Sequence, residues 1–464
     1  MTPLSPGALS ELTAIEGLGV DTSEAGLAVS GSDFGRVVRG SALARVRPGS
    51  TEHLRELVAW ARRHGHKLTV RGAGMSQSGQ SVADESVSVD MSRCCEIEEP
   101  NVGERTLSCG AGATWRQILG RSLGSRLVPR VAPLNLDLTV GGTLSAGGFG
   151  SSSHRNGVAA STVASAEVVL GDGDVVRCGP KVRRDVFDAV FGGAGRIGII
   201  RKVDVALEQV PDTFRTYFLM YEDLETMLAD QVAIAASGHA LHLESFCSAS
   251  IQGLRRGPSG RRQPLVHWLY GLHVTTSAAG APASARELFP RLRCAKELHV
   301  EDEADYVAFA SRYDVRFEGM RATGAWEHAH PWFEVLLPLD SAAHVVRSAL
   351  DILPPFLGDG HRLVVLGESD APAAIALPAG RPVVIFGVFP VGVPPTLREP
   401  ALAALAKLHE IAISAGGKRY LSGWLFDMTS ASWQTHYGAS YAALLEARKK
   451  LDPDRIFRSK LAPL

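Results

Sequence analysis

Two glycine-rich stretches contain the residues of this chain that are best suited to hold a ligand. They are 70–80 (Val-Arg-Gly-Ala-Gly-Met-Ser-Gln-Ser-Gly-Gln) and 138–150 (Leu-Thr-Val-Gly-Gly-Thr-Leu-Ser-Ala-Gly-Gly-Phe-Gly). Because glycine has no Cβ, backbone N–H groups can approach an anion closely, and successive N–H groups can form a concave site for phosphate oxygens. We expect both stretches to bind one long diphosphate cofactor. Each alone is also compatible with an ordinary tight turn, since the chain contains 48 glycines.

A further glycine pattern, Gly-Ala-Gly-Arg-Ile-Gly at 193–198, matches GxGxxG literally. A dinucleotide-binding fingerprint of that kind needs a strand before it and a helix after it. The order here is reversed, because a helix is expected over 185–191 and a strand over 199–207. We therefore reject this pattern as a dinucleotide fingerprint.

Composition and charge exclude several classes of function. The chain has 48 Lys+Arg against 49 Asp+Glu, which leaves no net field to attract nucleic acid or acidic lipid. No apolar run reaches the roughly 18 residues that span a bilayer, and the N-terminal residues lack the pattern of a secretory signal. The six cysteines are scattered without metal-ligand spacing, so we expect free thiols, no metal site and a cytoplasmic location. The bias toward Ala, Gly and Arg is typical of a bacterium with GC-rich DNA.

The first glycine stretch follows the second strand of a predicted β-α-β unit. Strands are expected over 42–47 and 67–71, with a further strand over 86–91. Between the first two, apolar residues recur at helical spacing after Thr51, a plausible N-cap, and Gly65 is well placed to end this helix. The cofactor loop would therefore begin where a buried strand ends.

Beyond this unit the pattern predicts mixed helices and strands. Short elements are expected at 106–110 (strand) and 114–119 (helix), and the Gly-Asp-Gly-Asp sequence at 171–174 predicts a hairpin between strands 164–170 and 175–178. After residue 210, strands and helices alternate, which indicates an α+β architecture with antiparallel strands. The expected strands are 214–221, 265–275, 332–337, 363–366 and 383–388. The expected helices are 224–236, 284–293, 340–350, 399–416 and 441–450.

Together these motifs resemble the PCMH-type FAD-binding flavoproteins of the vanillyl-alcohol oxidase superfamily, and within them cytokinin dehydrogenase. The resemblance rests on the two glycine stretches and on 154–157, 185–200, 330–332, 418–421, 433–438 and 452–453. It implies an α+β FAD-binding domain of two subdomains over 1–208 and a substrate-binding domain over 209–417, with an antiparallel sheet flanked by helices. Residues 418–464 would return to the FAD domain.

The resemblance also implies which residues hold the FAD. They would grip an extended cofactor between the two subdomains, with Ile199 or Ile200 at its adenine end and Tyr420 beside the flavin. The implied residues are Val70, Arg71, Gly72, Ala73, Gly74, Met75, Ser76, Gln80, Leu134, Thr139, Gly141, Gly142, Ser145, Gly148, Phe149, Gly198, Ile199, Ile200 and Tyr420.

Two positions depart from the family pattern. Met75 stands where the family usually has a histidine joined covalently to the flavin, and a thioether cannot form that link, so we expect non-covalent FAD. Leu134 stands where cytokinin dehydrogenases have the aspartate that accepts the substrate amine proton. Asp137 is nearby, but the Leu-Thr-Val-Gly-Gly run that follows fixes the register against it. Cytokinin oxidation by the family mechanism is therefore not expected.

Hydride transfer still needs a base, which contributes typically about 10²–10⁴-fold. The resemblance places the segment around Trp332 against the substrate, and alternation along a strand puts Glu334 on the same face. Glu334 is the first candidate base, Tyr420 the second and Glu244 the third, while Asn135 is a candidate to orient a polar group of the substrate. Each also has a purely structural interpretation, as a sheet carboxylate or a buried polar side chain.

These observations predict an FAD-dependent oxidoreductase that moves hydride from a small organic substrate to flavin N5, with O₂ or another acceptor reoxidising the flavin. We expect a role in bacterial natural-product biosynthesis. The alternatives are a non-redox flavoprotein of the cyclase, isomerase or lyase type, a cytokinin dehydrogenase-like amine oxidase with a displaced base, and a non-catalytic FAD-binding protein. No oligomeric state is predicted.

Overall fold

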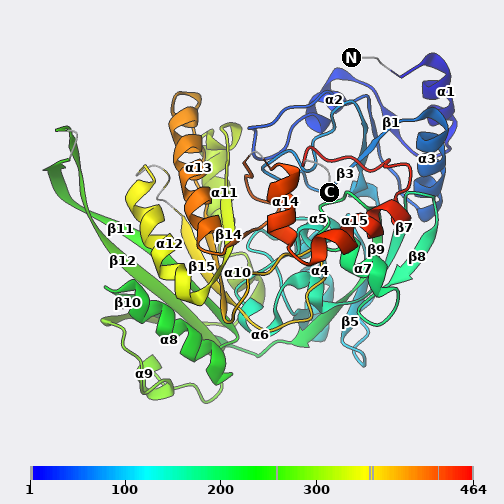
Figure 1. Cartoon of the computed structure of the whole chain (residues 1–464). Helices are drawn as coiled ribbons and strands as arrows, with labels where there is room; N and C mark the ends of the chain where they lie inside the picture. Colours follow the sequence, from blue (N-terminus) through cyan, green and yellow to red (C-terminus); the bar gives the residue numbers. More distant parts are fainter. Residues whose placement is uncertain (1–3, 258–259, 355–356, 358–359, 427, 462–464) are drawn as a thin grey trace.

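Residues 4–257, 260–354, 357, 360–426 and 428–461 are described in the computed structural model of the chain (Figure 1). The first three residues, on which part of the argument against a secretory signal rests, lie outside these ranges. Helices and strands are mixed along the described chain, and the strands form three sheets. This confirms the predicted α+β class. Within these ranges no helix combines the length and the apolar character that crossing a bilayer requires.

The first sheet has four strands and carries the first glycine stretch. Their spatial order is β1 (Val20–Asp21), β2 (Ala44–Val46), β4 (Val87–Asp90) and β3 (Leu68–Arg71), and both β2 and β3 run parallel to β4. The helices of this part are α1 (Pro6–Ala14), α2 (Glu24–Ser30) and α3 (Thr51–His64). The β-α-β prediction is confirmed, although Ser50 rather than Thr51 caps α3; Gly65 ends it with φ 69°.

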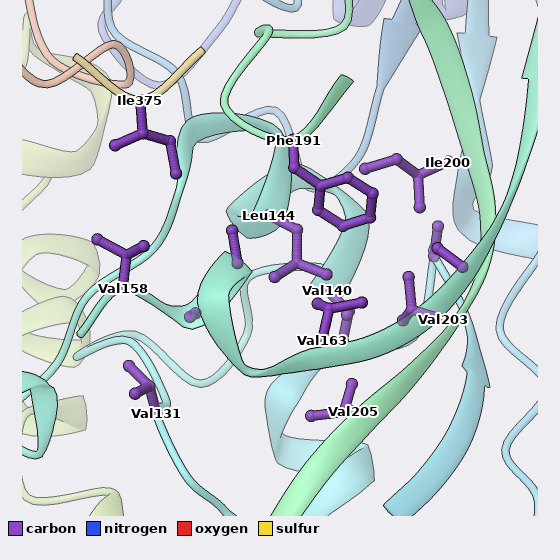
Figure 2. Close-up of a cluster of buried hydrophobic side chains, with 14 of the residues drawn as sticks. Val131, Val140, Leu144, Val158, Val163, Phe191, Ile200, Val203, Val205 and Ile375 are labelled. Atoms are coloured by element: carbon purple, nitrogen blue, oxygen red, sulfur yellow. The ribbon is translucent and has the colours of Figure 1, made fainter. Parts of the chain in front are cut away.

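The second glycine stretch packs against a five-stranded antiparallel sheet, on the face that is covered by helices. The strands are β5 (Thr106–Gly110), β9 (Gly198–Gln209), β7 (Val163–Leu170) and β8 (Val175–Cys178), with β6 (Leu127–Pro129) also paired to β9. The helices are α4 (Trp115–Ser122), α5 (Val140–Ala146), α6 (Ser153–Asn156) and α7 (Arg184–Val190). Figure 2 shows Val140 and Leu144 of α5 packing with Val163, Val203 and Val205 of this sheet. The predicted hairpin is β7–β8.

The largest sheet has eight antiparallel strands and provides the other half of the molecule (Figure 1). In spatial order the strands are β13 (Lys296–Glu303), β10 (Phe214–Tyr221), β12 (Arg262–Ser277), β11 (His242–Arg256), β15 (His361–Leu366), β16 (Val383–Val388), β14 (Phe333–Pro338) and β17 (Lys418–Arg419). Three helices, α8 (Leu224–Ser237), α12 (Leu339–Ile352) and α13 (Arg398–Ser414), bury one face of it in a common apolar cluster. The opposite face of this sheet is not covered by these three helices and is available for a functional site.

The remaining helices connect or close these parts. They are α9 (Ala285–Leu288), α10 (Tyr306–Ala310), α11 (Asp314–Ala322), α14 (Ser430–Tyr437) and α15 (Ser440–Leu451). The helix predicted over 284–293 is wrong beyond α9. Strand β13 and helix α11 were not predicted. Strand β13 reads Lys-Glu-Leu-His-Val-Glu-Asp-Glu, and most of its side chains are exposed. An exposed edge strand has no apolar pattern to identify it.

The C-terminal segment is fixed to the four-stranded sheet by backbone contacts. The N–H of Leu68 donates to Ile456 O and the N–H of Arg458 donates to Leu68 O, both at 2.8 Å. Fully buried Asp452 shapes this return, since its carboxylate accepts from the N–H groups of Ile456 at 2.9 Å and Phe457 at 3.1 Å. The boundaries at 208/209 and 417/418 stay a prediction.

Replacing Asp452 tests this attachment. Asp452→Ala leaves two buried N–H groups without an acceptor, and hydrogen bonds to charged groups are worth about 1.5–3 kcal/mol each, so we expect a loss of about 3 kcal/mol in the free energy of unfolding, measured by urea denaturation. Asp454→Ala is the matched control, because Asp454 is 51% exposed and its side chain pairs with exposed Arg62. The control should change stability by less than about 1 kcal/mol. Equal effects of the two substitutions would contradict the interpretation.

Candidate active site

A cavity of about 1130 Å³ lies between the glycine stretches and the inner face of the eight-stranded sheet. This volume exceeds the roughly 300–1,000 Å³ of ordinary small-molecule pockets, so it has room for a large cofactor together with a substrate. The predicted residues that border it are Val70, Gly72, Ala73, Gly74, Met75, Ser76, Gln80, Leu134, Asn135, Thr139, Gly141, Gly142, Ser145, Gly148, Phe149, Gly198, Ile200, Glu244, Glu334 and Tyr420.

Two predicted cofactor residues do not border this cavity. The guanidinium of Arg71 turns back to donate to the carbonyl oxygens of Ser32 and Ser81, so it stabilises the loop from behind. Ile199 is fully buried in the apolar cluster of the four-stranded sheet, whereas Ile200 borders the cavity. Of the two isoleucines considered for the adenine end, Ile200 is the one that can reach a ligand.

The first glycine stretch leaves its cavity-side backbone free to donate. Among the described residues, no acceptor is recorded for the backbone N–H groups of 72–76. Gly74 has φ +71°, a backbone conformation that favours glycine. A run of unsatisfied N–H groups at the end of a strand is the arrangement that binds phosphate oxygens, and it fits the diphosphate of FAD.

A buried carboxylate that sequence reasoning missed holds this loop in shape. Asp33, 4% exposed, accepts from Ser76 Oγ at 2.9 Å and from the N–H groups of Gly79 at 2.8 Å and Arg36 at 3.3 Å. Burial raises the pKa of Asp33 to about 6 despite these donors. Asp33 lies far from the loop in sequence and in no recognisable pattern, so only the fold brings it there.

Residues 140–146 of the second glycine stretch form helix α5, where the sequence predicts an anion-binding loop. Thr139 caps α5 by accepting from the N–H of Gly142 at 3.3 Å. The N–H groups of Val140 and Gly141 donate to carbonyl oxygens of the 111–113 segment at 2.8 Å, so they are not available to phosphate. The stretch contributes a closely fitting wall instead, since a Cβ on Gly72 would lie 2.1 Å from Thr139 Oγ1.

Tyr420 borders the cavity. Its hydroxyl oxygen accepts from the N–H of Gly148 at 2.8 Å, and its ring lies edge-on to Phe149 with centroids 5.0 Å apart. Burial and the nearby Glu334 raise the pKa of the phenol well above its ordinary value. Tyr420 is therefore a neutral hydroxyl and not a phenolate base at physiological pH.

Glu334 is a buried carboxyl on the cavity border, and its pKa is raised. It lies on β14, is 5% exposed and borders the cavity. Burial raises the pKa of its carboxyl to about 7, and a hydrogen bond from Ser422 Oγ to Oε2 at 3.2 Å opposes that shift in part. A carboxyl that titrates near 7 can accept a proton and release it again at physiological pH.

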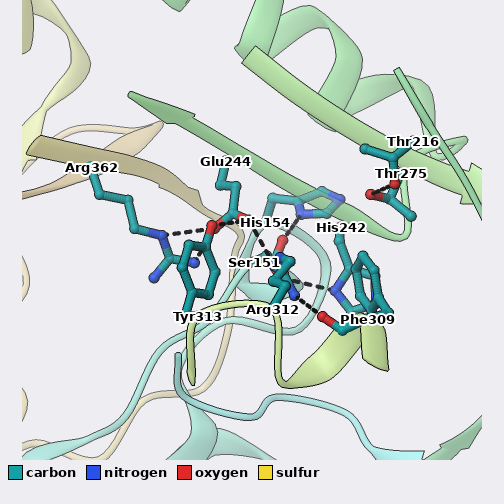
Figure 3. A network of polar contacts seen from close by, with 10 residues as sticks. All are labelled: Ser151, His154, Thr216, His242, Glu244, Thr275, Phe309, Arg312, Tyr313 and Arg362. Atoms are coloured by element: carbon teal, nitrogen blue, oxygen red, sulfur yellow. Dashed lines mark hydrogen bonds and ion pairs between the residues drawn. The ribbon is translucent and has the colours of Figure 1, made fainter. Parts of the chain in front are cut away.

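Glu244 is tied into a charged network instead (Figure 3). Its Oε1 accepts from Arg312 at 2.7 Å and from the Tyr313 hydroxyl at 2.6 Å, and its Oε2 accepts from Arg362 Nε at 2.8 Å. The two guanidinium groups hold the pKa of this buried carboxyl well below its usual range. A carboxylate stabilised in this way is a weak base, so the structure argues against Glu244 as the proton acceptor.

The segment that follows the family's aspartate position contributes no base. Leu134 borders the cavity and packs toward a small apolar cluster that includes Phe34. Asp137, 54% exposed, pairs with Arg116 at 2.6 Å and does not border the cavity. Asn135 does border it, and its Oδ1 accepts from the N–H of Asp137 at 3.0 Å. The register argument against Asp137 therefore agrees with its place in the structure.

Two family models match the sequence. One, described as an FAD binding domain, matches residues 42–179, and the other, described as "Cytokinin dehydrogenase 1, FAD and cytokinin binding", matches residues 270–356. An uncharacterised oxidoreductase of the fasciation locus of Rhodococcoides fascians is 28% identical over 413 residues, covering 88% of this chain and 90% of the relative. Cytokinin dehydrogenases 4 and 9 of Oryza sativa subsp. japonica are 27% and 26% identical, each covering 86% of this chain and 78% and 82% of their own lengths.

Removal of the Asp33 carboxylate tests how the first glycine loop holds a cofactor. Asp33→Ala should lower the affinity for FAD about tenfold or more, because the loss of hydrogen bonds to one charged group costs about 1.5–3 kcal/mol. Titration of apoprotein with FAD, followed by flavin fluorescence, measures this. Asp84→Asn, which changes a carboxylate bonded to Ser41 and Lys460 outside the loop, should stay within about twofold of the parent. Parental affinity in Asp33→Ala would refute the role given to Asp33.

Proposed function

Because the chain is an FAD-dependent oxidoreductase of the cytokinin dehydrogenase-like family, with an FAD-binding domain of the PCMH type, we propose that it oxidises a small organic substrate with non-covalently bound FAD and Glu334 as the base. The observation that carries the proposal is the buried carboxyl of Glu334, which faces the cavity and has a pKa of about 7. A family enzyme without the usual aspartate still needs a proton acceptor, and Glu334 supplies one.

The chain's own residues divide the work between cofactor and substrate. The free N–H groups of 72–76 would hold the diphosphate, and α5 with Tyr420 would support the flavin. FAD, when bound, would supply the acceptor for the hydride of the substrate C–H bond, and O₂ or another acceptor would take up the two electrons. Glu334 would take the proton from the adjacent O–H or N–H group at a carboxylate oxygen. The substrate thus loses one hydride and one proton, and a double bond forms between carbon and the heteroatom.

Non-covalent attachment is part of the proposal and rests on Met75. Its thioether borders the cavity beside the first glycine loop and packs toward the cluster of Phe34, Phe317 and Met320. A thioether has no N–H to replace. A bond from its sulfur to the flavin methyl carbon would give a charged sulfonium and not a stable neutral link. We therefore expect FAD that dissociates when the protein unfolds.

Leu134 and the cytokinin-binding family model favour two narrower candidates. Amine oxidation of a cytokinin-like substrate, with Glu334 as the displaced base, is supported by the match over 270–356 and by the rice relatives. A non-redox reaction that uses FAD structurally is favoured only by the leucine, which cannot act as a base. The six unpaired cysteines support a cytoplasmic setting. The composition supports a bacterial source, and the leucine at the position of the family's aspartate supports a repurposed site in natural-product biosynthesis.

Glu334→Gln tests the base. With the substrate that bleaches the flavin fastest in an anaerobic screen of alcohols, amines and polycyclic natural products, the variant should reduce its flavin about 10²–10⁴-fold more slowly. Since only the ionised carboxyl accepts a proton, the parental rate should rise from pH 6 to pH 8 through the pKa of about 7, and the variant should lose this rise. Stopped-flow absorbance of the flavin measures both.

Glu410→Gln is the matched control for this experiment, because Glu410 is exposed on α13, away from the cavity. It should keep the parental rate and pH profile. Unchanged reduction in Glu334→Gln would refute Glu334 as the base. A product with the mass of the substrate, formed while the flavin never bleaches, would instead favour the non-redox candidate.

Acid precipitation of the yellow protein tests the cofactor linkage. All flavin absorbance should appear in the supernatant, because no residue of this chain is expected to bond to the flavin covalently. The absorbance of supernatant and pellet at about 450 nm measures the partition. Flavin that stays with the pellet after washing would show that another residue forms the link and that the argument from Met75 fails.

A further inference from the structure

Glu334 and Arg362 lie in one row across the cavity face of the large sheet. Glu334 on β14 and Arg362 on β15 are both paired in register with Gly387 on β16, the strand between them. Directly opposed residues of adjacent strands point to the same face, so both side chains reach the cavity. Two strand spacings of about 4.8 Å put their Cα atoms roughly 10 Å apart.

An aromatic ring fills the space between these two side chains. Gly387 has no side chain, and a Cβ there would lie 2.2 Å from the ring of Phe389. Phe389 borders the cavity, and Trp332 meets its ring edge-on with centroids 5.0 Å apart. The floor of the cavity is therefore a carboxyl, then a flat apolar surface, then a guanidinium.

The charge balance along this floor depends on the protonation of Glu334. The carboxylates are Glu244 and Glu334, and the arginines bonded to Glu244 are Arg362, which is buried, and Arg312, which is 29% exposed. These four charges cancel while Glu334 is ionised, and protonation of Glu334 leaves one positive charge in excess. An uncompensated charge is costly to bury.

The acidic residues elsewhere on the cavity border do not offset this charge. Glu301 and Glu303 lie on β13, which is separated from β15 by three strands of the sheet. Both reach the surface on an edge strand, where water screens them from the guanidinium of Arg362. Glu301 and Glu303 therefore do not compensate the guanidinium of Arg362.

Arg362 also has a donor group that the protein leaves open. Its Nε and Nη2 both bond to Glu244, whereas no hydrogen bond from its Nη1 is recorded in the described part of the chain. Figure 3 shows the third nitrogen of Arg362 turned away from Glu244. Arg362 is only 5% exposed and borders the cavity. Its Nη1 is not one of the fully buried polar atoms that lack a hydrogen-bond partner. The fork to Glu244 fixes the guanidinium, and the remaining edge can receive a ligand.

We propose that the substrate carries a carboxylate, and that Arg362 binds it on the side of Phe389 opposite Glu334. This carboxylate accepts from Nη1 of a guanidinium that its two bonds to Glu244 hold in place. The flat middle of the substrate would lie over Phe389, which leaves the C–H bond to be oxidised near Glu334. Arg362 is thus a specificity-determining residue, and the substrate class is an acid with an apolar or aromatic body. This inference rests on the proposed function, since it concerns the same cavity.

Matched acid and amide probes test the inference on the holoenzyme. The probes are trans-cinnamate and trans-cinnamamide, which share an aromatic body and differ in the anionic group. Titration followed by the change in the flavin absorption spectrum at pH 8 should show cinnamate binding at least tenfold more tightly than cinnamamide to the parent. In Arg362→Gln the two affinities should agree within twofold, through loss of cinnamate binding alone.

Two further variants keep the test falsifiable. Arg362→Lys retains the charge and should keep a cinnamate preference of at least threefold even if Arg362→Gln does not fold. Arg347→Gln, in an exposed ion pair on α12, should behave as the parent. Equal parental affinities for both probes, or a preference that survives Arg362→Gln, would overturn the inference. A cinnamate preference without flavin bleaching by any substrate would support the inference while refuting the oxidase proposal.

Discussion

The site depends on the backbone hydrogen bonds of one short segment, 420–425. On one side it continues the large sheet, because the N–H of Tyr420 donates to Glu334 O at 3.1 Å and that of Trp424 to Trp332 O at 2.6 Å. On the other side Ser422 O accepts from the N–H of Gln77 at 3.1 Å, within the first glycine stretch. The cofactor loop and the strand that carries the proposed base are therefore joined by backbone hydrogen bonds to the same short segment.

Electrostatics divides the cavity into two ends with opposite chemical properties. At one end burial leaves Glu334 with little compensation, so its carboxyl holds a proton unusually well. At the other end Arg312 and Arg362 keep Glu244 ionised. Two carboxylates on one sheet face thus take opposite roles, because their neighbours differ and not because the side chains do.

Local patterns predicted what local interactions decide. The β-α-β unit, the hairpin at 171–174 and the strand alternation that selected Glu334 all depend on neighbours in sequence. The helix at 140–146 was missed because its cap and its packing on 111–113 outweigh the weak helix propensity of glycine. Asp33 and Arg362 gave no signal either, since each acquires its role from partners that are distant along the chain. A single charged residue makes no periodic pattern in the sequence, so its burial cannot be predicted from one.

Because position 387 is a glycine, the shape of the cavity there and the pairing of the sheet depend on different residues. Every ladder hydrogen bond of β16 is made by backbone atoms, whereas the space above Gly387 is filled by Phe389, a residue beyond the end of that strand. A smaller residue at 389 would lengthen or deepen the cavity without disturbing strand pairing. Related enzymes can therefore diverge in the size of molecule they accept through one substitution outside the ladder, while the two charged ends keep their spacing.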